Sequence, residues 1–165
     1  MSQARRAATE REFTAFFDAR ATAFRRTAYG LVGDWGRAEE LTQTTFERLW
    51  RHWPRIAAGS PEAYARRVLL NLFLDERKWN AELPTDELPE QASTAGDPNL
   101  RLDVGAALAR LPRQMRAVVV LRFLDDRSVT ETAAALGIAE GTVKAHTHRA
   151  MAALAPLLAP IGGDR

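Results

Sequence analysis

Residues 80–100 constrain the fold most, because the helical pattern of apolar residues on either side stops there. The segment reads NAELPTDELPEQASTAGDPNL, with three prolines and one glycine but few large apolar side chains. Such a composition breaks helices and favours a linker. A chain of 165 residues divided here has room for two small domains. We therefore expect a domain at 1–79, an acidic linker at 80–103, a second domain at 104–155 and a short tail at 156–165.

The charge follows the same division. Residues 1–79 carry 14 Lys and Arg against 10 Asp and Glu, and residues 104–155 carry 7 against 4. Between them, residues 80–103 carry 6 acidic residues and one basic residue. Basic domains suit nucleic acid binding, but solvated helix faces give similar imbalances, so charge alone decides little.

Several classes of protein are excluded by what the sequence lacks. The chain has no cysteine, so disulfides and thiolate metal sites are excluded and a cytoplasmic location is expected. Charged residues interrupt every apolar run near the N-terminus, so we expect neither a signal peptide nor a membrane span. Gly-rich phosphate loops, Gly-x-Ser-x-Gly and carboxylates at ligand spacing from a histidine are absent. We expect no enzyme activity, no metal site and no cofactor.

The first domain shows helical periodicity. Apolar residues recur at helical spacing over residues 13–31, and three glycines then indicate a turn. A second amphipathic run covers 38–53 and is expected to end at Pro54. Residues 60–62, Ser-Pro-Glu, have the capping hydroxyl, first-turn proline and acid that begin a helix. Because β-strand alternation is absent, the predicted fold class is all-α.

Residues 128–154 have the pattern of a helix-turn-helix motif. Ser128 and Glu131 can form a capping box, and Ala133 is small enough for a close helix crossing. Gly137 lies where the turn needs a permissive backbone. One face of the following helix returns to the core, so its opposite face is expected to enter a major groove.

The outer face of that second helix carries donors that can contact phosphates and base edges. A solvated face of an ordinary helical hairpin is the alternative, but the capping box, turn glycine and small residues together favour DNA. Two histidines on this helix do not share a face, so they are not expected to bind a metal. The predicted DNA contacts are Thr142, Lys144, Ala145, His146, His148 and Arg149.

Residues 29–50 read YGLVGDWGRAEELTQTTFERLW. This segment resembles the core-polymerase-binding segment of the extracytoplasmic-function (group 4) sigma factors of the sigma-70 family, the sigma-E-like type with a sigma-2 and a sigma-4 domain. In that family an Ala-Glu-Asp/Glu-Leu-x-Gln-x-x-Phe pattern opens a helix that packs on a coiled coil of the large polymerase subunit. The resemblance implies polymerase contacts at Asp34, Glu39, Glu40, Gln43 and Trp50.

Residues 60–79 resemble the helix of this family that contacts the −10 promoter element and its displaced single strand. The loop at 52–59 corresponds to the position where the family holds a flipped-out base. On packing grounds we assign Tyr64 and Phe73 to the core. The resemblance implies −10 contacts at Arg55, Ile56, Arg66, Arg67, Asn71, Arg77, Lys78 and Trp79.

Residues 106–154 resemble the domain of the same family that reads the −35 element. Two departures are notable: Ala145-His146 replaces the usual Ser-Arg, and Met151 replaces an arginine. Fewer cations should weaken phosphate contacts and alter the −35 preference.

The resemblance covers about residues 12–155 and implies a sigma factor that directs promoter-specific transcription initiation. Its implied partners are bacterial core RNA polymerase (the beta and beta-prime subunits), duplex −35 DNA and single-stranded −10 DNA. An anti-sigma factor is a further candidate partner, although no residue identifies one. One alternative is a stand-alone helix-turn-helix regulator, which leaves residues 29–50 and the acidic linker unexplained. The other is a protein-interaction adaptor, for which Lys144 and Arg149 would be replaceable.

Overall fold

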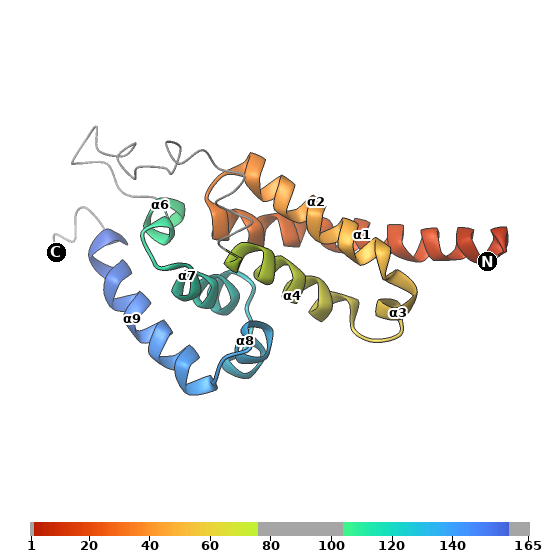
Figure 1. Ribbon diagram of the computed structural model, residues 1–165. Coiled ribbons are helices and arrows are strands. Elements are labelled where there is room, and N and C mark those ends of the chain that lie inside the picture. The colour runs from red at the N-terminus through yellow and green to blue at the C-terminus, as the bar shows by residue number, and fades with distance from the viewer. Residues whose placement is uncertain (1, 76–103, 159–165) are drawn as a thin grey trace.

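The computed structural model describes residues 2–75 and 104–158, and every regular element in these two ranges is a helix (Figure 1). The predicted all-α class is thereby confirmed. The linker at 80–103 and the predicted contacts Arg77, Lys78 and Trp79 lie outside the described residues. The elements are α1 (Gln3–Val32), α2 (Trp35–Arg51), α3 (Trp53–Ala57), α4 (Pro61–Leu74), α6 (Val104–Ala109), α7 (Arg113–Val119), η3 (Val120–Leu124), α8 (Val129–Leu136) and α9 (Glu140–Leu158).

Helices α1 and α2 form a hairpin in the N-terminal unit. Gly33 ends α1 in the left-handed region at φ 72°, and the Asp34 carboxylate then accepts a 2.9 Å hydrogen bond from the Arg37 amide at the start of α2. Thr42 and Thr45 face the core, where each hydroxyl donates to the carbonyl four residues earlier. Because these hydrogen bonds satisfy the buried hydroxyls, the hairpin can hold both threonines in its core.

The expected end of the second helical run at Pro54, and the expected loop at 52–59, are wrong. Helix α2 ends at Arg51, and α3 follows with Pro54 in its first turn. Proline is tolerated there because the first-turn amides have no intrahelical partner. Trp53 and Ile56 then turn into the core, so the short helix is held by burial.

Helix α4 begins as predicted, with the Ser60 hydroxyl accepting from the Ala63 amide and Pro61 in the first turn. The predicted capping box of Ser128 and Glu131 also forms, and Gly137 ends α8 in the left-handed region at φ 66°. An unpredicted element lies between α4 and α8: the helix that begins at Arg113 widens into the π-helix η3. The Asp125 amide donates to the Val120 carbonyl five residues earlier.

The two units lie side by side (Figure 1), and they share one continuous apolar core. This core joins Leu31 and Leu69 of the first unit to Leu121 and Leu154 of the second. A Cβ on Gly30 would lie 3.0 Å from Leu124 Cδ2, so glycine permits α1 to approach η3 closely. Across the described residues, none of the helices combines the length and apolarity that a membrane span requires.

Candidate protein- and nucleic-acid-binding surfaces

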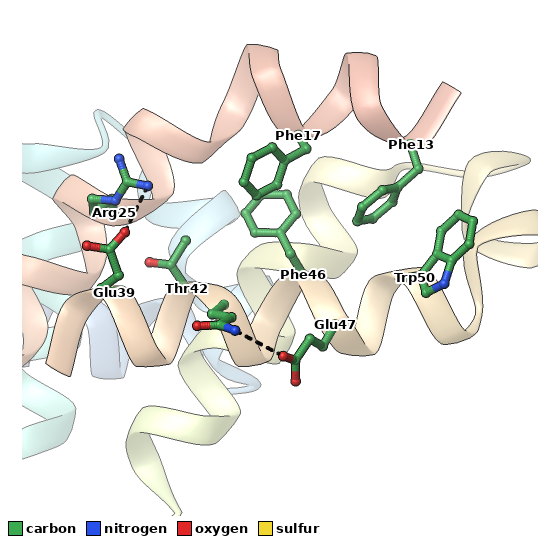
Figure 2. A pocket seen from close by; sticks show the side chains of 9 residues that line it. Phe13, Phe17, Arg25, Glu39, Thr42, Phe46, Glu47 and Trp50 are labelled. Carbon is green, nitrogen blue, oxygen red and sulfur yellow. Dashed lines mark hydrogen bonds and ion pairs between the residues drawn. The ribbon is translucent and has the colours of Figure 1, made fainter. Parts of the chain in front are cut away.

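A groove of about 490 Å³ runs between α1 and α2 (Figure 2). Its floor is aromatic: the ring of Phe17 meets that of Phe46 at 4.9 Å, and the ring of Phe13 meets that of Trp50 at 5.2 Å. Phe17 and Trp50 remain 36% and 39% exposed. Large aromatic side chains left half-exposed at a concave surface are typical of protein-binding sites.

Polar side chains line the α2 side of this groove. Glu39 pairs with Arg25 of α1 at 3.2 Å, and the Gln43 amide donates to Glu47 at 3.3 Å (Figure 2). The groove therefore combines an aromatic floor with carboxylates that can pair with basic residues of a partner.

Three of the five predicted polymerase contacts, Glu39, Gln43 and Trp50, line this groove together. Glu40 is exposed on the same helix outside the lining, and Asp34 is engaged in capping α2. Phe13 and Phe17 also line the groove but are not among the predicted contacts, although both fall in the run of helical spacing over residues 13–31. The sequence does contain a signal for them: the apolar residues of α1 continue on the N-terminal side of Ala21, which is the first buried residue of that helix.

The predicted −10 contacts Arg55, Ile56 and Asn71 do not lie together in the structure. Ile56 is only 6% exposed and belongs to the core. Helix α3 lies at the N-terminal end of α4, whereas Asn71 lies near its C-terminal end (Figure 1). Ten residues of helix separate Pro61 from Asn71, which is about 15 Å along the axis. Arg55 and Asn71 are both exposed, but at opposite ends of the helix.

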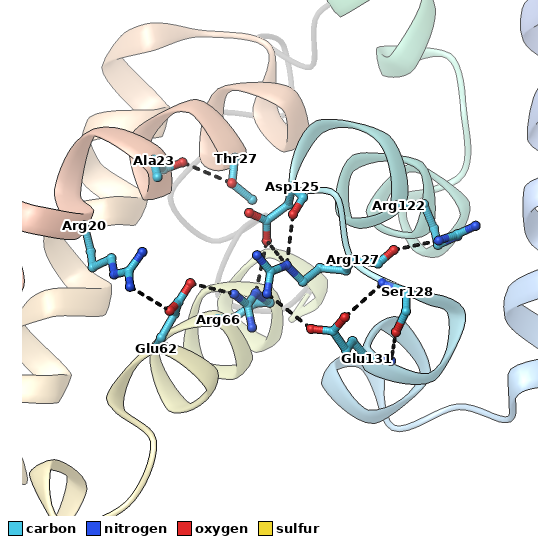
Figure 3. Close-up of polar contacts among 10 residues, drawn as sticks. All are labelled: Arg20, Ala23, Thr27, Glu62, Arg66, Arg122, Asp125, Arg127, Ser128 and Glu131. Carbon is cyan, nitrogen blue, oxygen red and sulfur yellow. Dashed lines mark hydrogen bonds and ion pairs between the residues drawn. The ribbon is translucent and has the colours of Figure 1, made fainter.

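Helix α4 presents its other predicted contacts unequally. Arg67 is exposed, whereas Arg66 is 8% exposed and lies between two carboxylates (Figure 3). Its Nε donates to Asp125 Oδ2 at 3.0 Å and its Nη2 to Glu62 Oε1 at 3.2 Å. The assignment of Tyr64 to the core was wrong, since this side chain is 40% exposed, while Phe73 is buried as predicted.

The helix-turn-helix formed by α8 and α9 is held by local contacts. Ala133 and Val143 pack on Val118 of α7 as a small apolar cluster. The Ser128 backbone amide and hydroxyl, in that order, hold the pKa of Glu131 below its usual range. The apolar cluster joins α8 to α9 and so orients the outward face of α9.

The outward face of α9 carries four of the six predicted −35 contacts: Lys144, Ala145, His148 and Arg149 are exposed. Thr142 and His146 are half-buried. His146 turns toward α7, where its Nε2 lies 3.0 Å from the Gln114 side-chain oxygen. His146 thus contributes to packing between α9 and α7 in this structure, and the long cations Lys144 and Arg149 dominate the exposed face.

Comparisons with known proteins match both units of the chain. The family described as Sigma-70 region 2 matches residues 16–81, and the family described as Sigma-70, region 4 matches residues 101–154. The RNA polymerase sigma-E factor of Streptomyces antibioticus is 40% identical over 151 residues, covering 87% of this chain and 82% of that protein. The ECF RNA polymerase sigma factor SigL of Mycobacterium tuberculosis is 36% identical over 163 residues, covering 92% and 91%.

A solved structure shares the fold. The sigma factor RpoE of Bartonella quintana, crystallised with the anti-sigma factor NepR, superposes with a TM-score of 0.69 at 23% identity. The match covers 93% of this chain and 99% of that one. The likeness therefore extends over both helical units and includes their arrangement in one chain.

Proposed function

Because this chain belongs to the extracytoplasmic-function sigma factors of the sigma-70 family, we propose that it gives bacterial core RNA polymerase promoter specificity through three separate surfaces. Residues 1–79 bind the polymerase and the −10 element, residues 104–155 bind the −35 element, and residues 80–103 join them. The chain acts by binding and has no catalytic activity of its own. It works in the cytoplasm, where the polymerase is.

The groove between α1 and α2 is the polymerase-binding surface in this proposal. A partner helix can bury apolar side chains against Phe13, Phe17 and Trp50 while its basic residues pair with Glu39 and Glu47. Three of its lining residues, Glu39, Gln43 and Trp50, belong to the 29–50 segment that a stand-alone DNA-binding regulator leaves unexplained. This observation therefore carries the sigma-factor function over the regulator.

Promoter DNA is bound by both units. The exposed face of α9, with Lys144 and Arg149, reads duplex −35 DNA. The exposed side chains Arg67 and Tyr64 of α4 track and stack on the unpaired −10 strand. Capturing unstacked bases stabilises the open promoter, with each stack contributing ~1–3 kcal/mol.

An anti-sigma factor is a further partner in this proposal. The same groove that receives the polymerase is available to such a protein, which would then compete with the polymerase for Phe17 and Trp50. The relative solved with NepR supports this only by analogy of fold.

The test is co-purification of the full chain with sigma-free core polymerase, followed by run-off transcription on genomic DNA. We expect a stable complex and transcripts that share one promoter sequence. Phe17→Glu, which places a charge in the groove, should abolish the complex. Thr14→Glu is the matched control, since Thr14 is exposed on the same helix outside the groove lining. Specific duplex binding without polymerase binding would refute the proposal in favour of a conventional regulator.

A further inference from the structure

Arg66 forms an ion pair between the two units. It belongs to α4 of the first unit, yet its Nε donates at 3.0 Å to Asp125, which follows η3 in the second unit (Figure 3). The side chains of Arg66 and Asp125 are only 10% and 20% exposed. Removing one partner of a contact this well shielded from water leaves the other charge buried and unpaired, which costs more than breaking a surface ion pair.

Asp125 is held in place by its own unit. The Arg127 Nε donates to the Asp125 carbonyl at 2.9 Å and lies 3.7 Å from its carboxylate. Arg127 is in turn bound to Glu131 of the capping box at 3.2 Å. Asp126 takes a left-handed conformation at φ 51°, which sets the direction of the chain after the carboxylate. The second unit therefore presents an oriented anion to Arg66.

Two more arginines of the second unit donate hydrogen bonds to backbone carbonyls of the first unit. Arg116 donates to the Leu31 carbonyl at 2.8 Å, and Arg113 donates to the Phe73 carbonyl at 3.2 Å. These carbonyls lie in the last turns of α1 and α4, where an α-helix has no amide partner to offer and the helix dipole favours a cation. Both guanidinium groups also lie over the Phe73 ring, at 5.6 and 5.7 Å from its centroid. The packed arrangement of the two units, called here the closed chain, thus has specific polar contacts in addition to its apolar core.

A carboxylate that engages an arginine uses the same chemistry as a backbone phosphate. We propose that Asp125 is a built-in competitor for the −10 strand: in the closed chain it occupies Arg66, and a strand phosphate can bind Arg66 only after the two units separate. This inference rests on the proposed function, which assigns α4 to the −10 strand. The exposed face of α9 is unaffected by closure, so the closed chain retains its −35 surface, while on α4 Arg67 and Tyr64 stay exposed and Arg66 is occupied.

The first measurement is the distance between the two units in the full chain. Since the chain has no cysteine, Thr22→Cys on α1 and Ala153→Cys on α9, both exposed, accept spin labels at two defined sites. Pulsed electron spin resonance should give one narrow distance in the otherwise unchanged chain. Asp125→Asn should add a longer, broader population, with the open fraction increased at least about tenfold. Asp126→Asn removes the same charge from the exposed neighbouring residue and should leave the distance unchanged.

The second measurement is binding of the full chain to a fluorescent single-stranded oligonucleotide of mixed sequence at low salt. Asp125→Asn should bind about tenfold more tightly than Asp126→Asn, which controls for the lost negative charge. Adding Arg66→Gln to Asp125→Asn should remove that gain. Circular dichroism checks that each variant keeps its helices.

The proposal is overturned if Asp125→Asn matches Asp126→Asn in either measurement, or if the gain in affinity survives Arg66→Gln. Failure of the proposed function has a different signature. In that case the chain does not bind core polymerase, while the distance and oligonucleotide measurements still respond to Asp125→Asn.

Discussion

Removing the two long cations on the outer face of α9 should change how promoter binding depends on salt. Lys144 and Arg149 are both exposed on that face. If each contacts one phosphate, each contributes ~0.9 to the slope of log affinity against log salt concentration. The double variant Lys144→Ala/Arg149→Ala should therefore have a slope shallower by about 1.8. Between about 50 and about 200 mM salt, the ratio of wild-type to variant affinity should fall about 12-fold.

The assay is fluorescence anisotropy of the reconstituted polymerase on a duplex that carries the promoter found by run-off transcription. Arg110→Ala is the control, because Arg110 is an exposed cation of the same unit that lies outside α9. Its slope should equal that of the wild type. Polymerase binding by the double variant should be unchanged. Equal slopes of log affinity against log salt concentration for the double variant and the wild type would refute the assignment of this face to DNA.

Three further outcomes are expected from the contacts described above. Ser128→Ala should lower the free energy of unfolding by about 1 kcal/mol, measured by urea denaturation, because the first turn of α8 loses its cap. Glu131 has a lowered pKa, so its contribution to stability is complete above the ordinary carboxyl pKa of 4.5 and is lost as the pH falls through the lowered pKa. The free energy of unfolding, measured by urea denaturation below pH 4.5, should therefore fall more steeply with pH for the wild type than for Glu131→Gln. Phe46→Ala should cost ~3–5 kcal/mol of stability since the ring is buried, whereas Trp50→Ala, half-exposed in the groove, should cost far less stability but weaken polymerase binding by about tenfold. Equal stability losses for these two variants would contradict the division between floor and docking surface.

The local features of the fold were predictable because they depend on residues close in sequence. Ser60 with Pro61 begins a helix, and Ser128 with Glu131 forms a capping box, as their spacing predicts. Gly137 takes the positive φ that the turn requires. Each of these features joins residues at most four apart in sequence, so the pattern of side chains suffices to identify it.

The candidate sites were less predictable, because they depend on how helices pack. The resemblance of residues 60–79 to a −10-binding helix implies Arg66 as a DNA contact, but its partner Asp125 lies 59 residues away in sequence. The resemblance places Ile56 among the −10 contacts in an expected loop at 52–59, whereas α3 turns it into the core. The groove at Phe17 exists only because α2 leaves part of the aromatic face of α1 uncovered. Helical spacing shows which residues share a face but not which neighbouring helix covers it.

The π-helix η3 bears on how relatives of this chain should be aligned. Its wide turn accommodates one residue more than an α-helical turn would, and the Asp125 amide closes that turn on the Val120 carbonyl at 2.9 Å. Each residue of an α-helix advances the chain by about 100° around the axis. Deleting one residue from 121–124 would replace this five-residue turn with a four-residue one, so the Asp125 amide would still close on the Val120 carbonyl and Asp125 would keep nearly the same direction around the axis. A single-residue gap at this turn is thus compatible with the same carboxylate facing Arg66, and relatives should be aligned on the aspartate after the turn and not on its distance from the start of α7.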